Sequence, residues 1–187
     1  FLADPDVVNK AEAGKASTIR PCVGCNAKCL DMAMVSKPIG CIGNYECNRE
    51  EELEDENGLM PTEKKSEHPE KILVIGAGPS GMEFARVAAL RGHKVTIWEK
   101  RNRTIGLSLY AATPPRRYDI RYFGQWLERT CRELGVEIIL NKEATAEDII
   151  AASKDYDRVV LACGSKASIP PIPRDPSVPI VHACDVF

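Results

Sequence analysis

Short apolar runs alternate with segments of helical periodicity in the second half of the chain. Residues 71–75 (KILVI) and 94–99 (KVTIWE) are apolar runs of the length expected for buried strands. Phe123, Leu127, Cys131 and Leu134 recur at helical spacing, which predicts an amphipathic helix over 121–134. The predicted elements are strands at 71–75, 94–99, 136–140 and 158–162, and helices at 79–91, at 121–134 and after a capping box at Thr145–Asp148. Strands that alternate with helices predict an α/β fold with a parallel, Rossmann-like sheet.

The first 70 residues lack this alternation. Asp4 and Pro5 predict the N-cap and the first position of a short helix, which Gly14 would end. Residues 20–48 combine cysteines with glycine and proline and show little periodicity, so we expect a loop. Six of the seven residues from Glu50 to Glu56 are acidic, which is typical of a solvated linker, with a docking surface as the alternative. We therefore divide the chain into residues 1–49, a polar linker at 50–70, and an α/β unit at 71–187.

Composition excludes several classes of partner. The 187 residues carry a formal net charge of −2, which gives no electrostatic basis for binding nucleic acid or an anionic membrane. No apolar run approaches the roughly 20 residues of a membrane helix, and no signal peptide opens the chain. The eight cysteines are clustered rather than spread as in a disulfide-rich secreted protein. We therefore expect a cytoplasmic protein that uses thiols for metal or redox chemistry.

The sequence VIGAGPSGMEFA at 74–85 contains a dinucleotide-binding turn. Gly76, Gly78 and Gly81 form the G-x-G-x-x-G pattern between a predicted strand and a predicted helix, where the helix N-terminus favours a pyrophosphate. Glu99, at the end of the next strand, is the acid expected to bond a ribose hydroxyl, and its charge opposes a 2′-phosphate at this turn. The predicted nucleotide contacts also include Pro79, Ser80 and Lys100. The turn alone does not separate FAD from NAD.

Four cysteines follow the spacing C-x2-C-x3-C-x11-C and comprise Cys22, Cys25, Cys29 and Cys41. Three thiolates in a tight loop and a fourth that returns nearby are suited to enclose one ion or cluster. Zinc is the alternative, but zinc sites usually pair two C-x2–4-C knuckles, and here the fourth cysteine stands alone. The asymmetry favours an iron–sulfur cluster. Cys47, Cys131, Cys163 and Cys184 are interpreted as small buried or loop residues, with a substitute ligand as the alternative for Cys47.

Taken together, the two motifs resemble the 2,4-dienoyl-CoA reductase branch of the old-yellow-enzyme-like NADH:flavin oxidoreductases. Residues 20–41 resemble the [4Fe-4S] loop of that family, and residues 73–100 resemble its FAD turn. GVEIILNKEATAEDI (135–149) and YDRVVLACGS (156–165) follow in the family's order. The related amine dehydrogenases, such as trimethylamine dehydrogenase, are also similar, but their cluster loop typically has one residue fewer between the second and third cysteines.

The resemblance implies further FAD contacts at Gly106, Ala162 and Gly164. Leu107 stands where the family usually has a second glycine, and we expect its side chain to crowd the flavin ring. Residues 1–10 resemble the segment that leaves an FMN-binding barrel, and the chain begins without methionine. We therefore expect a piece of a longer protein whose FMN-barrel and NAD(P)H-binding parts are partners of this chain.

The activity that this resemblance implies is electron relay. Electrons would pass from NAD(P)H through FAD and the [4Fe-4S] cluster to FMN, which reduces an activated C=C bond of an enoate or enoyl/dienoyl-CoA small molecule. The residues of this chain would hold cofactors, and none is predicted to be a catalytic acid or base. Two alternatives stay open: an amine dehydrogenase of the trimethylamine dehydrogenase type, and a zinc-stapled nucleotide-binding module without enzymatic activity.

Overall fold

The computed structural model describes residues 1–166, 168, 171, 173, 177–179 and 181. A four-stranded parallel sheet lies at its centre, in the order β3-β2-β1-β4. The strands are β1 (Lys71–Ile75), β2 (Lys94–Trp98), β3 (Glu137–Ile139) and β4 (Arg158–Leu161). In the register of the sheet, Leu73 pairs with Thr96 on β2 and with Val159 on β4. The predicted α/β class with a parallel Rossmann-like sheet is confirmed.

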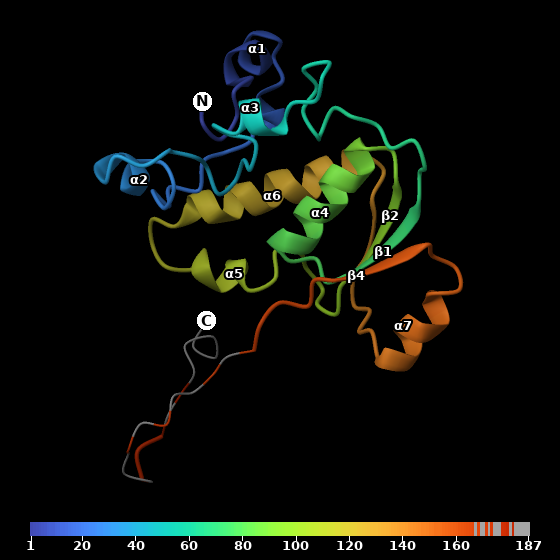
Figure 1. Ribbon diagram of the computed structural model, residues 1–187. Coiled ribbons are helices and arrows are strands. Elements are labelled where there is room, and N and C mark those ends of the chain that lie inside the picture. Colours follow the sequence, from blue (N-terminus) through green and yellow to red (C-terminus); the bar gives the residue numbers. More distant parts are fainter. Residues whose placement is uncertain (167, 169–170, 172, 174–176, 180, 182–187) are drawn as a thin grey trace.

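Helices cover both faces of the sheet (Figure 1). Helices α4 (Pro79–Leu90) and α6 (Tyr118–Glu133) lie on one face, and α7 (Ala146–Ala152) packs on the other. The short helix α5 (Ser108–Ala111) follows β2 and contacts α6. Along β1, Ile72 and Val74 face α4 and α6, while Leu73 and Ile75 face α7. Because both faces are buried, the strand is a continuous apolar run rather than an alternating one.

The predicted capping box is present at the start of α7. The Thr145 hydroxyl accepts a hydrogen bond from the Asp148 N–H, and the Asp148 carboxylate accepts one from the Thr145 N–H. Two otherwise unpaired N–H groups are satisfied in this way, which fixes where a helix of only seven residues begins.

The N-terminal segment contains four short helical elements. They are α1 (Val7–Glu12), the 3-10 helix η1 (Ala16–Thr18), α2 (Leu30–Met34) and α3 (Glu50–Leu53). Gly14 follows α1 with a φ of +68°, as expected for a helix stop. The predicted N-cap at Asp4 is wrong, because the N-cap is Asp6. The Asp4 side chain is buried instead, where it accepts hydrogen bonds from the Lys10 side chain and the Arg20 N–H.

Residues of the predicted linker contact the end of α4. Lys65 Nζ donates to the Leu90 carbonyl oxygen at 2.6 Å, and the Ser66 N–H donates to the Arg91 carbonyl oxygen at 2.8 Å. Arg91 Nη1 in turn donates to the Pro61 carbonyl oxygen at 3.2 Å. These contacts place residues 61–66 against the α/β unit, while the boundaries at 49 and 70 stay a prediction.

Helix α6 joins the N-terminal segment to the sheet. Trp126 is buried on this helix, and its indole Nε1 donates to the Thr18 carbonyl oxygen at 3.0 Å. The Arg20 guanidinium lies 5.0 Å from the centre of the Trp126 ring, and the Phe123 ring packs against Gly43. The segment that carries the cysteines is therefore fixed directly to the unit that carries the glycine turn.

Candidate dinucleotide and thiol sites

Two glycines of the turn, Gly76 and Gly81, are packed too closely to carry a side chain. Gly76 has a φ of +109°, and a Cβ atom there would lie 2.4 Å from the Ala162 carbonyl oxygen. A Cβ atom on Gly81 would lie 2.1 Å from the Gly76 carbonyl oxygen and 3.1 Å from the Ala162 Cβ. Both distances are far below contact distance, so these two positions require glycine. Ala162, which the resemblance implied as a flavin contact, forms the wall of the turn.

The remaining glycine of the motif, Gly78, faces open space. Gly78 is the N-cap of α4, and a Cβ atom on it would meet no atom within 4 Å. Pro79 occupies the first helical position and has no N–H, while the first intrahelical hydrogen bond runs from the Met82 N–H to the Gly78 carbonyl oxygen. The N–H groups of Ser80 and Gly81 therefore have no acceptor inside the helix. This end of α4 has both the free donors and the open approach that a pyrophosphate requires.

The carboxylate of Glu99 lies directly at the turn. Its Oε2 accepts a hydrogen bond from the Ala77 N–H at 2.8 Å, and its Oε1 accepts one from the Arg101 N–H at 2.9 Å. Glu99 is buried, and the neighbouring Lys100 is exposed. Glu99 thus fastens the turn to the end of β2, in addition to the ribose contact predicted from its position. Each carboxylate oxygen retains a lone pair for a ribose hydroxyl.

A second loop supports the turn, and of its residues only Gly106 was predicted to belong to the site. The Ile105 N–H donates to the Ala77 carbonyl oxygen at 2.8 Å, and Gly106 packs against Gly78, with 3.2 Å between its ideal Cβ position and the Gly78 Cα. Ile105 adopts a φ of +63°, which is unfavourable for a β-branched residue and costs about 1–3 kcal/mol. Its side chain is buried against Gly124 of α6, where a Cβ atom would lie 2.3 Å from Ile105 Cγ2. The glycine inside an amphipathic helix was the available sign of this close approach.

The remaining predicted flavin contacts lie around the same turn. The Ala162 N–H donates to the Ile75 carbonyl oxygen at 2.8 Å, and Gly164 follows with a φ of +75°. Leu107 has a φ of −68° and an exposed side chain, so the backbone at this position does not itself require glycine. Cys163, between the two predicted contacts, is exposed. The crowding of a flavin ring by Leu107 stays a prediction.

The four predicted metal ligands line one small cavity. Cys22, Cys25, Cys29 and Cys41 contribute to its wall, together with Pro21, Val23, Asn26, Lys28, Gly40, Ile42 and Gly43. The Gly24 N–H donates to the Cys22 sulfur at 3.4 Å, a type of contact that orients a thiolate ligand. Within the described residues, no group of three or more His, Cys, Asp or Glu side chains is arranged to hold a metal ion. The structure therefore brings the four thiols to one cavity but does not show a metal centre.

Two of the other cysteines are buried. Burial, and then the neighbouring Cys41, raises the pKa of the Cys47 thiol. Burial raises the pKa of Cys131 to about 12, and its S–H donates to the Met82 carbonyl oxygen at 3.2 Å. A thiol must be ionised to bind metal, so these environments favour a packing role. Cys184 lies outside the described residues.

A parallel sheet with a glycine turn at the β1–α4 junction and an acid after β2 defines the dinucleotide-binding class of α/β proteins. Residues 23–154 match the pyridine nucleotide-disulphide oxidoreductase family, and the chain belongs to this family. It is 48% identical, over its whole length, to a metal reductase from Desulforamulus reducens, of which it covers 27%. Among solved structures, a 2-naphthoyl-CoA reductase superposes with a TM-score of 0.80 at 34% identity, over 91% of this chain and 25% of that one. Histamine dehydrogenase from Rhizobium sp. 4-9 superposes with a TM-score of 0.78 at 28% identity, over 95% of this chain and 25% of that one.

These comparisons confirm the resemblance to the old-yellow-enzyme-like reductases and identify an oxidoreductase domain. They also support a flavin cofactor. The chain spans about a quarter of the length of the relatives it matches. In the described part of the chain, no helix has the length and apolar character needed to cross a membrane.

Replacing Glu99 with alanine should weaken both the turn and dinucleotide binding. The ribose contact should account for about 1–3 kcal/mol of the binding free energy, the range for a hydrogen bond to a charged group. The free energy of unfolding should fall as well, because the N–H groups of Ala77 and Arg101 lose their acceptor. Calorimetry with ADP and urea denaturation measure the two effects. Unchanged ADP affinity would place the ribose elsewhere, and Glu133→Ala, which removes an exposed acid at the end of α6, serves as the control.

Proposed function

We propose that this chain is the electron-relay portion of an NAD(P)H-dependent flavin and iron–sulfur oxidoreductase. FAD would bind at the Gly76–Gly81 turn, and a [4Fe-4S] cluster would bind Cys22, Cys25, Cys29 and Cys41. The observation that carries the proposal is that these four thiols line one cavity, in a segment packed against a helix of the dinucleotide-binding unit.

The residues around the turn support FAD rather than a 2′-phosphorylated nucleotide. The donors of Ser80 and Gly81 would hold the pyrophosphate, and Glu99 would hold the ribose nearest to it. The buried Glu99 carboxylate would repel a phosphate group on that ribose. Ala162 and Gly164 lie at the carboxyl end of β4, where ligands of open α/β sheets bind.

The cysteine spacing supports a cluster more than a single zinc ion, because it lacks the second knuckle that is usual for zinc. The four cysteines share one cavity, although no metal-holding group is formed among the described side chains. When bound, a cluster would carry one electron at a time between carriers of two electrons. The chain itself would ligate the cluster through Cys22, Cys25, Cys29 and Cys41 and orient the thiolates by backbone donors such as the Gly24 N–H.

The relatives and the loop spacing support one reaction class. A metal reductase and a 2-naphthoyl-CoA reductase support a reductive direction, in which an FMN held elsewhere in the intact protein would supply the electrons that reduce an activated C=C bond. Histamine dehydrogenase supports the second candidate, an amine dehydrogenase that passes electrons outward. The three residues between Cys25 and Cys29 favour the reductase.

Metal analysis of the full-length protein tests this proposal. After anaerobic reconstitution, we expect about four iron and four sulfide per cysteine segment, with visible absorption. Cys41→Ser should lose most of that iron, because it removes the one ligand outside the tight loop. Cys163→Ser, an exposed cysteine at the other site, should retain it. Stoichiometric zinc without visible absorption would instead support the zinc-stapled module.

A further inference from the structure

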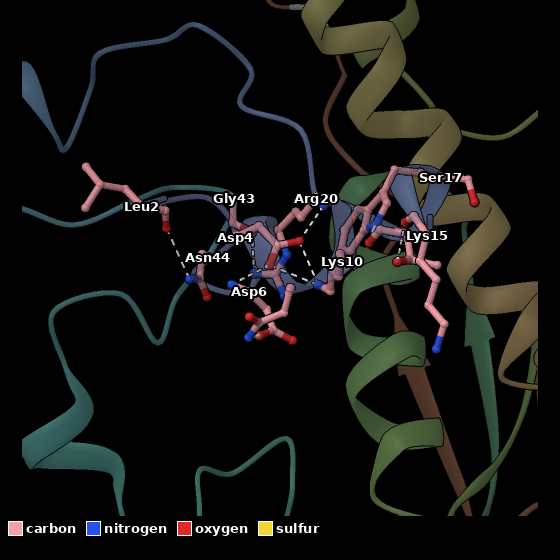
Figure 2. Close-up of polar contacts among 12 residues, drawn as sticks. Leu2, Asp4, Asp6, Lys10, Lys15, Ser17, Arg20, Gly43 and Asn44 are labelled. Carbon is pink, nitrogen blue, oxygen red and sulfur yellow. Dashed lines mark hydrogen bonds and ion pairs between the residues drawn. The ribbon is translucent and has the colours of Figure 1, made fainter. Parts of the chain in front are cut away.

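Polar contacts from residues 2–10 join the two ends of the cysteine loop. We call these ends the neck of the loop: Arg20, two residues before Cys22, and Gly43–Asn44, which follow Cys41. Figure 2 shows Asp4 at the centre of these contacts. The Arg20 N–H donates to Asp4 Oδ2 at 2.7 Å, and Lys10 Nζ donates to both carboxylate oxygens at 2.9 and 2.7 Å.

The other end of the loop, Gly43–Asn44, is held by hydrogen bonds of the Arg20 and Asn44 side chains. Arg20 Nη1 donates to the Gly43 carbonyl oxygen at 3.0 Å, so one residue spans both ends of the loop. Asn44 is buried, and its side-chain amide donates to the Leu2 carbonyl oxygen at 3.2 Å (Figure 2). All of these donors and acceptors are protein atoms.

Asp4 is the least replaceable member of this group. Its side chain is buried, and burial raises its pKa, but the hydrogen bonds from Lys10 and the Arg20 N–H lower the pKa further, so the net shift is downward. An ionised buried carboxylate with a cationic partner forms short, strong hydrogen bonds. Asparagine would keep one acceptor oxygen but would turn an NH2 donor toward the Lys10 ammonium and toward the N–H of either Arg20 or Asp6.

Closing a loop before its ligand binds has a thermodynamic consequence. Bringing the ends of a flexible loop together costs entropy that depends weakly on loop length. If protein contacts already close the loop, the bound group does not have to supply that free energy. The saving in free energy should be largest for Cys22 and Cys41, which lie next to the two ends of the loop.

We propose that Asp4 is a positioning residue that holds the neck of the cysteine loop closed, so that Cys22 and Cys41 are prearranged for the cluster. The closed neck is a property of the protein alone, whereas the consequence for the cluster rests on the proposed function. Asp4→Asn keeps the shape and removes the charge. Asp6→Asn is the matched control, because Asp6 is an exposed acid two residues away whose side chain accepts a hydrogen bond from the Asn9 amide, outside the neck.

Amide hydrogen exchange of the full-length protein without metal tests the closed neck. Asp4→Asn should speed exchange in peptides that cover residues 19–24 and 41–46 by about tenfold, equivalent to about 1.4 kcal/mol. Asp6→Asn should leave these peptides unchanged, and exchange in β1 and β2 should be the same in both variants. Equal exchange at the neck in Asp4→Asn and wild type would overturn the proposal. Faster exchange in β1 and β2 as well would also overturn it, because the effect would then be general destabilisation.

Cluster retention tests the second part. With iron bound, Asp4→Asn should release it to a chelator about tenfold faster than wild type, and the visible circular dichroism of the remaining cluster should change in shape. Global stability alone would not alter that spectrum, so an unchanged spectrum with wild-type release would reject a positioning role. A wild-type protein that never takes up iron would refute the proposed function. The hydrogen-exchange result would then decide separately whether Asp4 holds the neck closed.

Discussion

Replacing Gly81 with alanine should disrupt the dinucleotide turn. The added Cβ would lie 2.1 Å from the Gly76 carbonyl oxygen and 3.1 Å from the Ala162 Cβ. Neither atom can move away by rotation of a side chain. Overpacking of this kind usually costs about 1–3 kcal/mol and occasionally more. We expect about 3 kcal/mol here, because relief requires β1 and β4 to separate from α4. Urea denaturation measures the loss of stability, and calorimetry with ADP should show binding weakened by at least about tenfold.

Gly78→Ala is the matched comparison within the same motif. No atom lies within 4 Å of the added Cβ, and the backbone φ of −73° suits alanine. The free energy of unfolding should fall by no more than about 1 kcal/mol, the cost of a poorer N-cap. Dinucleotide binding should nevertheless weaken, because the methyl group occupies the approach to the helix N-terminus. Equal loss of stability in the two variants would contradict this separation of a packing glycine from a binding glycine.

Trp126→Ala should release the cysteine-bearing segment from α6. The variant loses a buried indole, its hydrogen bond to the Thr18 carbonyl oxygen, and the ring on which Arg20 and Arg86 lie. Truncating a buried tryptophan typically costs about 3–5 kcal/mol. Urea denaturation should show a loss in this range, and hydrogen exchange should rise at residues 16–20.

Trp126→Phe separates the ring from its polar atom. Phenylalanine keeps most of the packing but cannot donate to the Thr18 carbonyl oxygen, so we expect a loss of about 1 kcal/mol. If Trp126→Ala cost no more than Trp126→Phe, the ring would not be what holds the N-terminal segment in place.

The α/β unit could be predicted because its signals are local. The runs at 71–75 and 94–98 are buried on both faces, and the glycine spacing describes one strand–turn–helix junction. Helix α6 begins at Tyr118, three residues before the predicted start. The prediction missed this first turn because its residues are mostly exposed and carry no apolar periodicity. Strand β3 is shorter than the predicted strand at 136–140, because only three of its residues pair with β2.

The rest depended on residues that are distant in sequence. Trp126 bonds Thr18 across 108 positions, and Asp4 bonds Arg20 from beyond the helix it was expected to cap. The left-handed conformation of Ile105 could not be anticipated, because β-branched residues disfavour it and only packing against Gly124 explains it. The cysteine spacing indicated a shared site, but not the polar neck that brings its ends together.

The position of β4 at the margin of the sheet leaves one side of this strand open to pairing. Among the described residues, β4 pairs with β1 alone, and the Leu161 side chain is 69% exposed. An edge strand with free N–H and C=O groups and an apolar side chain is a template for pairing with another molecule. The ion pair of Arg158 with Glu70 keeps charge at one end of the strand only. The Leu161 end is therefore the less protected part of this edge.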